Sequence, residues 1–140
     1  MPPKSILILE DNEDRIKNFL KAAASLGENF PVRIWNDAPT MIAEVSSFLP
    51  EACLISLDHD LNPQPNATKD PGTGLEVAGF LAKQTPVCPV IIHTTNYERA
   101  WSMHNELRFG GWRVDRVGPI GGDWIECLWL PKVKAFLNIS

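Results

Sequence analysis

Short apolar runs alternate along this chain with longer segments in which apolar residues recur every three or four positions. Runs rich in Ile and Leu are typical of strands buried on both faces of a parallel sheet, and the longer period is typical of helices. The pattern predicts strands over residues 5–9, 32–35, 53–57, 87–92 and 112–117, and helices over residues 13–26, 39–48, 74–84, 97–109 and 121–137. Pro131 is expected to interrupt the last helix, because proline cannot donate an interior helical hydrogen bond.

Five strand–helix units joined by short connections predict a parallel sheet with helices on both faces and right-handed crossovers. A chain of 140 residues suits one domain, here residues 1–140, with enough length to bury a core. Asn12 and Asp37 are placed to cap the first two helices through their side-chain oxygens.

Two of the predicted strands end on carboxylates. Glu10 and Asp11 follow the first strand, and Asp58 and Asp60 follow the third. Ligands of open α/β sheets collect beyond the carboxyl ends of the strands, and four carboxylates there repel one another without a cation among them. A divalent cation with oxygen ligands, Mg²⁺ or Mn²⁺, is the simplest solution. Alternatively, Glu10 and Asp11 could cap the first helix, where the helix dipole favours negative charge. Asp58 and Asp60 could likewise belong to a turn, since aspartate often bonds its own backbone.

These strand ends resemble those of response-regulator receiver domains. The matching runs are ILILEDN at residues 6–12, LISLD at 54–58, GLEV at 74–77 and PVIIHT at 89–94. The resemblance covers nearly the whole chain. It implies a flavodoxin-like three-layer α/β sandwich with a five-stranded sheet in the order 2-1-3-4-5.

The resemblance also implies a function for individual residues. It implies a Mg²⁺ site made by Glu10, Asp11, Asp58 and the backbone carbonyl of Asp60, with Asp58 in the place of the phosphoacceptor. Receivers carry a lysine before a proline at the end of the fifth strand, where this chain has Gly118 followed by proline. The positive charge that neutralises the phosphoryl group in receivers is therefore missing from that position.

Two further signatures resemble the cyclic-phosphate processing receiver-like family. They are D-x-D-L at residues 58–61 and H-[ST]-x-N at residues 93–96, together with an unusually long loop over residues 61–73. The resemblance implies that receiver phosphoryl chemistry has moved onto phosphate-containing substrates.

Three polar residues are candidates for catalysis. Asp58 could be a nucleophile that forms an aspartyl-phosphate, or it could bind the metal together with Asp60 while a water attacks. His93 could act as a general acid or base near neutral pH. Strand alternation directs His93 away from Asp58, so a structural histidine is an alternative, although a twisted strand end could still bring it to the site.

Three further residues are candidates for substrate binding. Thr94 is the hydroxyl residue after the fourth strand, and Asn96 is either a phosphate-side donor or a helix N-cap. Lys69 is the one cation in the loop over residues 61–73 and could partly replace the missing lysine. We expect this loop to fold over the carboxylates as a lid, with an exposed insertion as the alternative.

Composition narrows the possible partners. The chain has 44% hydrophobic and 21% charged residues and a net charge of −4, which argues against a membrane-embedded protein and a broad nucleic-acid-binding surface. The three cysteines lack metal spacing and cannot all pair, and the N-terminus lacks a signal-peptide pattern, so we expect a cytoplasmic setting. The leading hypothesis is a metal-dependent hydrolase or transferase that acts on a cyclic or terminal phosphate of a nucleotide or RNA end. The alternatives are a stand-alone signalling receiver phosphorylated on Asp58, and a pseudo-receiver that binds a protein partner.

Overall fold

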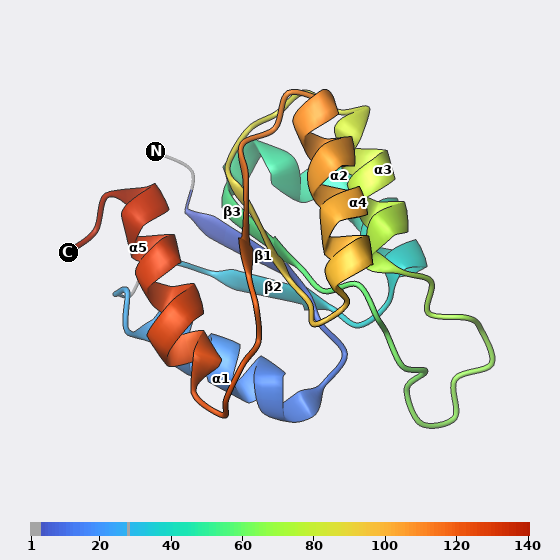
Figure 1. Cartoon of the computed structure of the whole chain (residues 1–140), viewed down its shortest axis with the longest axis horizontal. Helices are drawn as coiled ribbons and strands as arrows, with labels where there is room; N and C mark the ends of the chain where they lie inside the picture. The colour runs from blue at the N-terminus through green and yellow to red at the C-terminus, as the bar shows by residue number, and fades with distance from the viewer. Residues whose placement is uncertain (1–3, 28) are drawn as a thin grey trace.

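A five-stranded parallel sheet in the order β2-β1-β3-β4-β5 forms the centre of the computed structural model, which describes residues 4–27 and 29–140 (Figure 1). The strands are β1 (Ser5–Leu9), β2 (Val32–Trp35), β3 (Ala52–Leu57), β4 (Val90–His93) and β5 (Val114–Val117). The strand order and the parallel pairing confirm the flavodoxin-like fold that the sequence predicts.

Helices cover both faces of this sheet. Figure 1 shows α1 and α5 on one face and α2, α3 and α4 on the other. The helices are α1 (Glu13–Ala24), α2 (Ala38–Phe48), α3 (Gly74–Ala82), α4 (Tyr97–Phe109) and α5 (Leu130–Leu137), with a 3₁₀ turn η1 (Leu49–Glu51) and a π-helical segment η2 (Ile125–Trp129). Within the described residues, no helix combines the length and apolar character that crossing a bilayer requires.

The sheet separates the core into two halves, as the side chains of β1 show. Leu7 and Leu9 pack into the cluster beneath α2, α3 and α4, whereas Ile6 and Ile8 pack into the cluster beneath α1 and α5. Successive side chains of a strand point to opposite faces, so a strand covered on both faces needs apolar residues at every position. Each fully buried aliphatic side chain contributes about 1.5–3 kcal/mol to stability, which is why these runs are continuous.

A side-chain cap fixes the start of each of the first four helices. Asn12 accepts a hydrogen bond from the backbone N–H of Arg15 at 3.0 Å, and Asp37 accepts one from Thr40 at 2.7 Å. Thr73 and Asn96 cap α3 and α4 in the same way. The caps satisfy backbone donors that the first helical turn leaves unpaired, and they place the helix starts beside the carboxyl ends of the strands.

Several element boundaries differ from those predicted. Helix α1 ends at Ala24 instead of residue 26, and α3 ends at Ala82 instead of residue 84. Strand β5 begins at Val114 instead of residue 112, because the backbone N–H of Trp112 is bonded to Leu107 at the end of α4. Strand β4 begins at Val90 instead of residue 87, after a loop in which Val87 is exposed.

The last helix is irregular before Pro131 and regular after it. The π-helical segment ends at Trp129, and α5 continues through Pro131 to Leu137. The proline has no N–H to donate to the preceding turn, so that turn widens and Pro131 becomes part of the first turn of α5. The predicted interruption is therefore real, but it lies on the N-terminal side of the proline.

The long loop between β3 and α3 is closed at its base by backbone pairing. The N–H of Gly74 donates to the carbonyl of His59 at 3.0 Å, and Asp60 pairs with Thr73 in an antiparallel bridge. At Gly74 an added Cβ would lie 1.8 Å from the backbone oxygen of Asp58. Only glycine fits there, so the start of α3 fixes the backbone that follows β3.

This close approach gives a test of the loop base. We expect Gly74→Ala to lower the free energy of unfolding by more than about 2 kcal/mol, because the clash is with backbone atoms that cannot move aside locally. Gly79→Ala in the same helix is the control, since a Cβ there meets nothing within 4 Å. That change should stabilise the protein by about 0.5–1 kcal/mol through helix propensity. Equal effects of the two variants in urea unfolding would contradict the packing described here.

Candidate functional site

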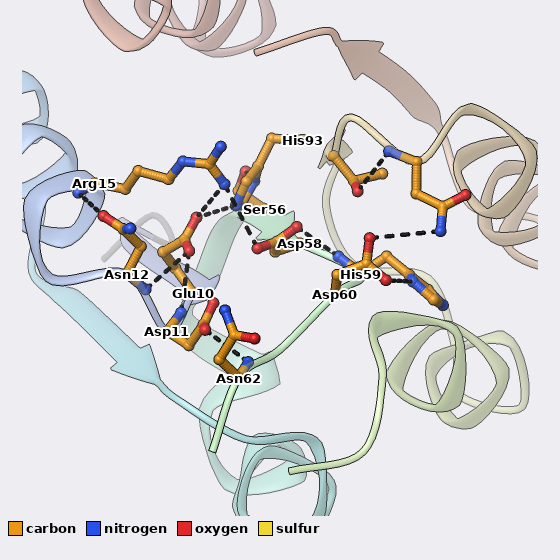
Figure 2. Close-up of polar contacts among 12 residues, drawn as sticks. Glu10, Asp11, Asn12, Arg15, Ser56, Asp58, His59, Asp60, Asn62 and His93 are labelled. Atoms are coloured by element: carbon orange, nitrogen blue, oxygen red, sulfur yellow. Dashed lines mark hydrogen bonds and ion pairs between the residues drawn. The ribbon is translucent and has the colours of Figure 1, made fainter. Parts of the chain in front are cut away.

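Three side chains meet at the carboxyl edge of three neighbouring strands. Glu10 follows β1, Asp58 follows β3 and His93 ends β4, and their potential ligand atoms all lie within 4.8 Å of one another. All three residues are buried, on the face covered by α1 and α5. Figure 2 shows the two carboxylates directed toward each other, with the imidazole beside them.

The register of the sheet explains why these three residues meet. Leu9 pairs with Leu57, and Leu57 pairs with Ile92. The next position along each strand is therefore Glu10, Asp58 and His93, which form one row on one face. The prediction that His93 points away from Asp58 is wrong, because the register places His93, and not Thr94, beside Asp58.

Glu10 is held by hydrogen bonds to both carboxylate oxygens. Its Oε2 accepts from the backbone N–H groups of Asp11 and Asn12, each at 3.1 Å, and its Oε1 lies 3.2 Å from Nε2 of His93. Burial raises the pKa of Glu10, but the contact with His93, the hydrogen bond from the Asn12 N–H and the positive charge of Arg15 together leave this pKa below its ordinary value. Glu10 is therefore a fixed, ionised carboxylate.

His93 belongs to a buried chain of polar contacts. Its Nδ1 lies 2.6 Å from Oγ of Ser56, and the indole N–H of Trp129 donates to the same oxygen at 2.9 Å. Because the indole can only donate, the hydroxyl hydrogen of Ser56 is available to Nδ1, and Nε2 carries the proton that His93 donates to Glu10. Burial lowers the pKa of His93, which agrees with this neutral tautomer.

Asp58 has one bonded and one available carboxylate oxygen. Its Oδ1 accepts a hydrogen bond from the backbone N–H of His59 at 2.7 Å, whereas its Oδ2 lies 3.8 Å from Nη1 of Arg15. Burial, followed by the negative charge of Glu10, raises the pKa of Asp58 to about 8. Because the carboxylates of Glu10 and Asp58 are buried with ligand atoms within 4.8 Å of each other, either a proton on Asp58 or a cation between them is favoured.

Arg15 provides a positive charge that the sequence analysis did not identify. Its Nη1 lies 3.7 Å from Oε1 of Glu10 and 3.8 Å from Oδ2 of Asp58, and its guanidinium carbon lies 5.5 Å from the centre of the Trp124 ring. Arg15 is the third residue of α1. Helical side chains lean toward the N-terminus of their helix, so Arg15 reaches back over the end of β1. A basic residue in the first helical turn after Glu10 and Asp11 was the signal in the sequence for a positive charge beside the carboxylates.

Asp11 lies beside the buried group but faces the long loop. Its Oδ2 accepts a hydrogen bond from the backbone N–H of Asn62 at 2.7 Å, and its backbone carbonyl accepts one from the side chain of Gln64 at 3.3 Å. Burial raises the pKa of Asp11. Of the predicted metal ligands, Glu10 and Asp58 belong to the buried group. Asp11 lies next to this group, and its carboxylate is bonded to the start of the loop (Figure 2).

Asp60 and Asn96 form a separate contact at the rim. The Asp60 side chain is 63% exposed, and its two oxygens lie 3.0 Å from Nδ1 of His59 and 3.4 Å from the amide nitrogen of Asn96. The amide oxygen of Asn96 caps α4 by accepting from Arg99, and Thr94 accepts from the backbone N–H of Asn96. Asn96 is therefore the N-cap, and Asp60 lies outside the Glu10–Asp58–His93 group.

Lys69 is exposed and lies away from the carboxylates. It borders a hollow of about 610 Å³ between the long loop and the start of α2, where Asp37 and Thr40 are also found. Figure 1 shows the loop after β3 extending outward from the body of the protein (green), and only its start touches the site, through Asn62 and Gln64. The loop does not cover the carboxylates as a lid in this structure.

Comparison with known proteins identifies the family and supports the fold. A family profile for the cyclic-phosphate processing receiver domain matches residues 6–109. The chain belongs to this family. No curated protein sequence matches the receiver domain described here.

Solved structures of receivers share its fold. One is a response regulator receiver domain from Rhodospirillum rubrum, with a TM-score of 0.70, 16% identity, and coverage of 97% of this chain and 95% of that chain. Another is the response regulator domain of Thermotoga maritima CheB, with a TM-score of 0.65, 15% identity, and coverage of 99% and 98%. The phosphorylated cyanobacterial phytochrome response regulator RcpA has a TM-score of 0.65, 18% identity, and coverage of 97% and 95%. At these identities the likeness shows the fold.

The receiver fold implies a divalent cation, and the residues here fit one. Glu10 and Asp58 offer hard carboxylate oxygens, and burial, with the charge of Glu10 second, raises the pKa of Asp58 when no cation is bound. Both ring nitrogens of His93 are engaged, by Ser56 and by Glu10, so the imidazole orients Glu10 and is not a free ligand. A set of oxygen donors without a free imidazole suits Mg²⁺ or Mn²⁺ better than zinc.

Sequence reasoning also missed Ser56 and Trp129. Ser56 is a fully buried hydroxyl within the apolar run of β3, and an isolated polar residue in such a strand was the signal for a hydrogen-bond partner. Trp129 reaches Ser56 from the π-helical segment across 73 positions of sequence. No pattern along the chain predicts a contact of that separation.

The raised pKa of Asp58 gives a prediction about stability in metal-free buffer. Between pH 3.8 and about 8 the folded protein keeps a proton that the unfolded chain has released, so the contribution of Asp58 to the free energy of unfolding falls as the pH rises through this window. Asp58→Asn removes the buried charge, and at pH 8 we expect it to be more stable than the wild type by more than about 1 kcal/mol. Urea unfolding between pH 5 and pH 8.5 in EDTA measures the difference.

The matched control is Asp60→Asn, which removes the exposed carboxylate two positions away. This variant should keep the pH dependence of the wild type, whereas Asp58→Asn should flatten it. An unchanged pH dependence in Asp58→Asn would show that the proton is not held at this residue.

Proposed function

We propose that this receiver domain is a metal-dependent phosphoester-processing enzyme that acts on a cyclic or terminal phosphate of a nucleotide or RNA end. The observation that carries the proposal is the buried Glu10–Asp58 pair beneath the guanidinium of Arg15. The two carboxylates could bind a cation and the guanidinium could bind an anion, at the edge of the sheet where α/β proteins bind ligands. The family's description as cyclic-phosphate processing supports the substrate class.

The metal would be held by Glu10 and Asp58, with Asp11 adjoining. When bound, a divalent cation would polarise a phosphoryl oxygen and help to generate a nucleophile from water. Asp58 has the Oδ2 atom available, because its Oδ1 is bonded to the N–H of His59. That free oxygen could bind the metal or attack phosphorus, and both roles require the ionised carboxylate.

His93 serves in this proposal as a positioning residue. It is fully buried, and it donates to Glu10 while accepting from Ser56. The imidazole therefore fixes the rotamer and the charge of Glu10 before any ligand arrives. Asp60, Thr94 and Asn96 lie at the rim, where a substrate would enter, and the Asp60–Asn96 contact presents polar atoms to it. Lys69 could contribute only after movement of the exposed loop.

The substrate itself carries negative charge on a small group. The net charge of −4 opposes binding along an extended nucleic acid backbone, whereas a single phosphate can be bound locally by a cation. A phosphate-bearing small molecule or the end of an RNA strand satisfies both conditions. A 2′,3′-cyclic nucleotide is the smallest probe of this class.

The proposal predicts metal-dependent turnover. Wild-type protein with Mg²⁺ or Mn²⁺ should open 2′,3′-cyclic AMP to a monophosphate, and EDTA should abolish the reaction. Asp58→Asn should reduce turnover by at least about 10³-fold, because the free Oδ2 is lost whether it binds metal or attacks phosphorus. Chromatography of the nucleotide products measures the rate, and calorimetry should show that the same variant loses metal binding. Full activity in Asp58→Asn, or activity in EDTA, would refute the proposal.

A second candidate function is a signalling receiver that accepts phosphate on Asp58. The observation in its favour is the close structural likeness to response regulators, among them the phosphorylated RcpA, over nearly the whole chain. The position of Asp58 at the end of β3 matches that of the phosphoacceptor in the resemblance. The absence of a lysine at Gly118 speaks against a long-lived phosphorylated state.

A small phosphodonor separates the two functions. Incubation with acetyl phosphate and Mg²⁺ should leave less than about a tenth of the protein with an added phosphoryl group, because Gly118 cannot neutralise an aspartyl-phosphate as the receiver lysine does. Intact-mass spectrometry measures the labelled fraction, with an ordinary receiver treated in parallel as the positive control. Persistent and stoichiometric labelling that Asp58→Asn removes would favour the signalling role.

A further inference from the structure

The guanidinium of Arg15 lies close to the carboxylates of Glu10 and Asp58 but does not form hydrogen bonds with them. Its Nη1 is 3.7 Å from Glu10 and 3.8 Å from Asp58, and both distances exceed those of a hydrogen bond. Within the described residues, the Arg15 side chain donates no hydrogen bond to any protein acceptor. A guanidinium has five N–H donors, so most of its donor capacity is left for a ligand.

An aromatic platform holds this guanidinium in place. The Trp124 ring lies 5.5 Å beneath it, and Trp124 itself is buried against the rings of Phe19 and His93 at 5.7 and 5.8 Å. The backbone N–H of Arg15 is also fixed, because it donates to the capping oxygen of Asn12. The Arg15 side chain remains 30% exposed, so a molecule entering from solvent can reach its donors.

The basic groups on and near β5 are engaged away from this site. At Gly118, where receivers carry lysine, the nearest atom to an added Cβ is the Cδ1 of Ile120 at 3.9 Å, so that corner is open. Arg116 of β5 stacks over Trp101 at 3.9 Å, and Lys132 pairs with Asp115 at 2.7 Å. Arg116 and Lys132 are thus already engaged, and Lys69 borders the hollow beside the start of α2.

We propose that Arg15 binds the phosphoryl group of the substrate through two of its N–H donors, and so supplies from α1 the charge that receivers supply from the end of β5. Planar guanidinium groups match phosphate oxygens in pairs, which a single ammonium group does not. The inference rests on the proposed function for its substrate class. A cation held by Glu10 and Asp58 would weaken their attraction on Arg15 and leave the Arg15 donors free for the phosphate.

The test measures binding instead of turnover. Calorimetric titration of inorganic phosphate into protein with saturating Mg²⁺ should show binding by the wild type, and Arg15→Gln should weaken it by about tenfold to a hundredfold. Mg²⁺ binding in Arg15→Gln should be retained or become tighter, because a competing positive charge beside the carboxylates is removed. Thermal unfolding establishes that the variant is folded.

Arg33→Gln is the matched control. Arg33 also lies 5.5 Å over a tryptophan ring, that of Trp35, and it also pairs with a carboxylate, that of Glu44 at 3.0 Å. It is on β2, and its substitution should leave phosphate affinity unchanged. As a measurement that needs no folded variant, the side-chain Nε–H resonance of Arg15 in the wild type should shift on addition of phosphate, and that of Arg33 should not.

The outcomes are distinct. Equal phosphate affinity in Arg15→Gln, absence of phosphate binding by the Mg²⁺-loaded wild type, or an unmoved Arg15 resonance would each overturn the inference. Joint loss of Mg²⁺ and phosphate binding in a folded Arg15→Gln protein would also overturn it, because Arg15 would then act only on the carboxylates. Phosphate binding that depends on Arg15, in a protein without turnover of cyclic nucleotides, would sustain the inference and reject the enzymatic function.

Discussion

The repulsion between two buried carboxylates, Glu10 and Asp58, governs the arrangement of everything around them. The strand register places both side chains in one row on one face, where burial removes the water that would screen their charges. Both oxygens of Glu10 therefore meet donors, from the backbone N–H groups of Asp11 and Asn12 and from His93, whereas Oδ2 of Asp58 has only the Arg15 guanidinium at 3.8 Å. The residual imbalance appears as the raised pKa of Asp58 and is the physical reason to expect a cation.

A polar chain connects this pair to the packing of the last helix. From Trp129 through Ser56 and His93 to Glu10, each group has one defined role as donor or acceptor. The four residues come from the π-helical segment, β3, β4 and the end of β1. A buried network of this kind is stable only when every member is satisfied, so the orientation of Glu10 depends on the position of Trp129. The widened turn before Pro131 is part of what places the indole there.

The proposed role of Arg15 contrasts with the receivers that this chain resembles in the origin of the positive charge. The resemblance implies a lysine at the end of the fifth strand in receivers. Here the positive group beside Asp58 is the guanidinium of Arg15 on α1, which lies over the Trp124 ring. An arginine differs from a lysine in presenting a planar set of donors, and an aromatic platform limits its rotation. In the proposed role of Arg15, the same fold would thus present a different geometry to a phosphate at this sheet edge.

The sequence by itself was sufficient for the fold, because apolar runs on a two-sided sheet and capped amphipathic helices are local patterns. Asn12, Asp37 and the apolar positions of β1 act in the structure as their patterns predict. Glu10 and Asp58 could be placed at one edge for the same reason, since each follows a strand.

The roles of His93 and Arg15 could not be predicted from such local patterns. The direction of His93 depends on the register between β3 and β4, which alternation within one strand does not determine. The contact of Arg15 with the carboxylates depends on how α1 packs on the sheet, and that of Ser56 with Trp129 on a widened turn far along the chain. Such contacts arise only when separate elements come together, so only the tertiary structure decided them.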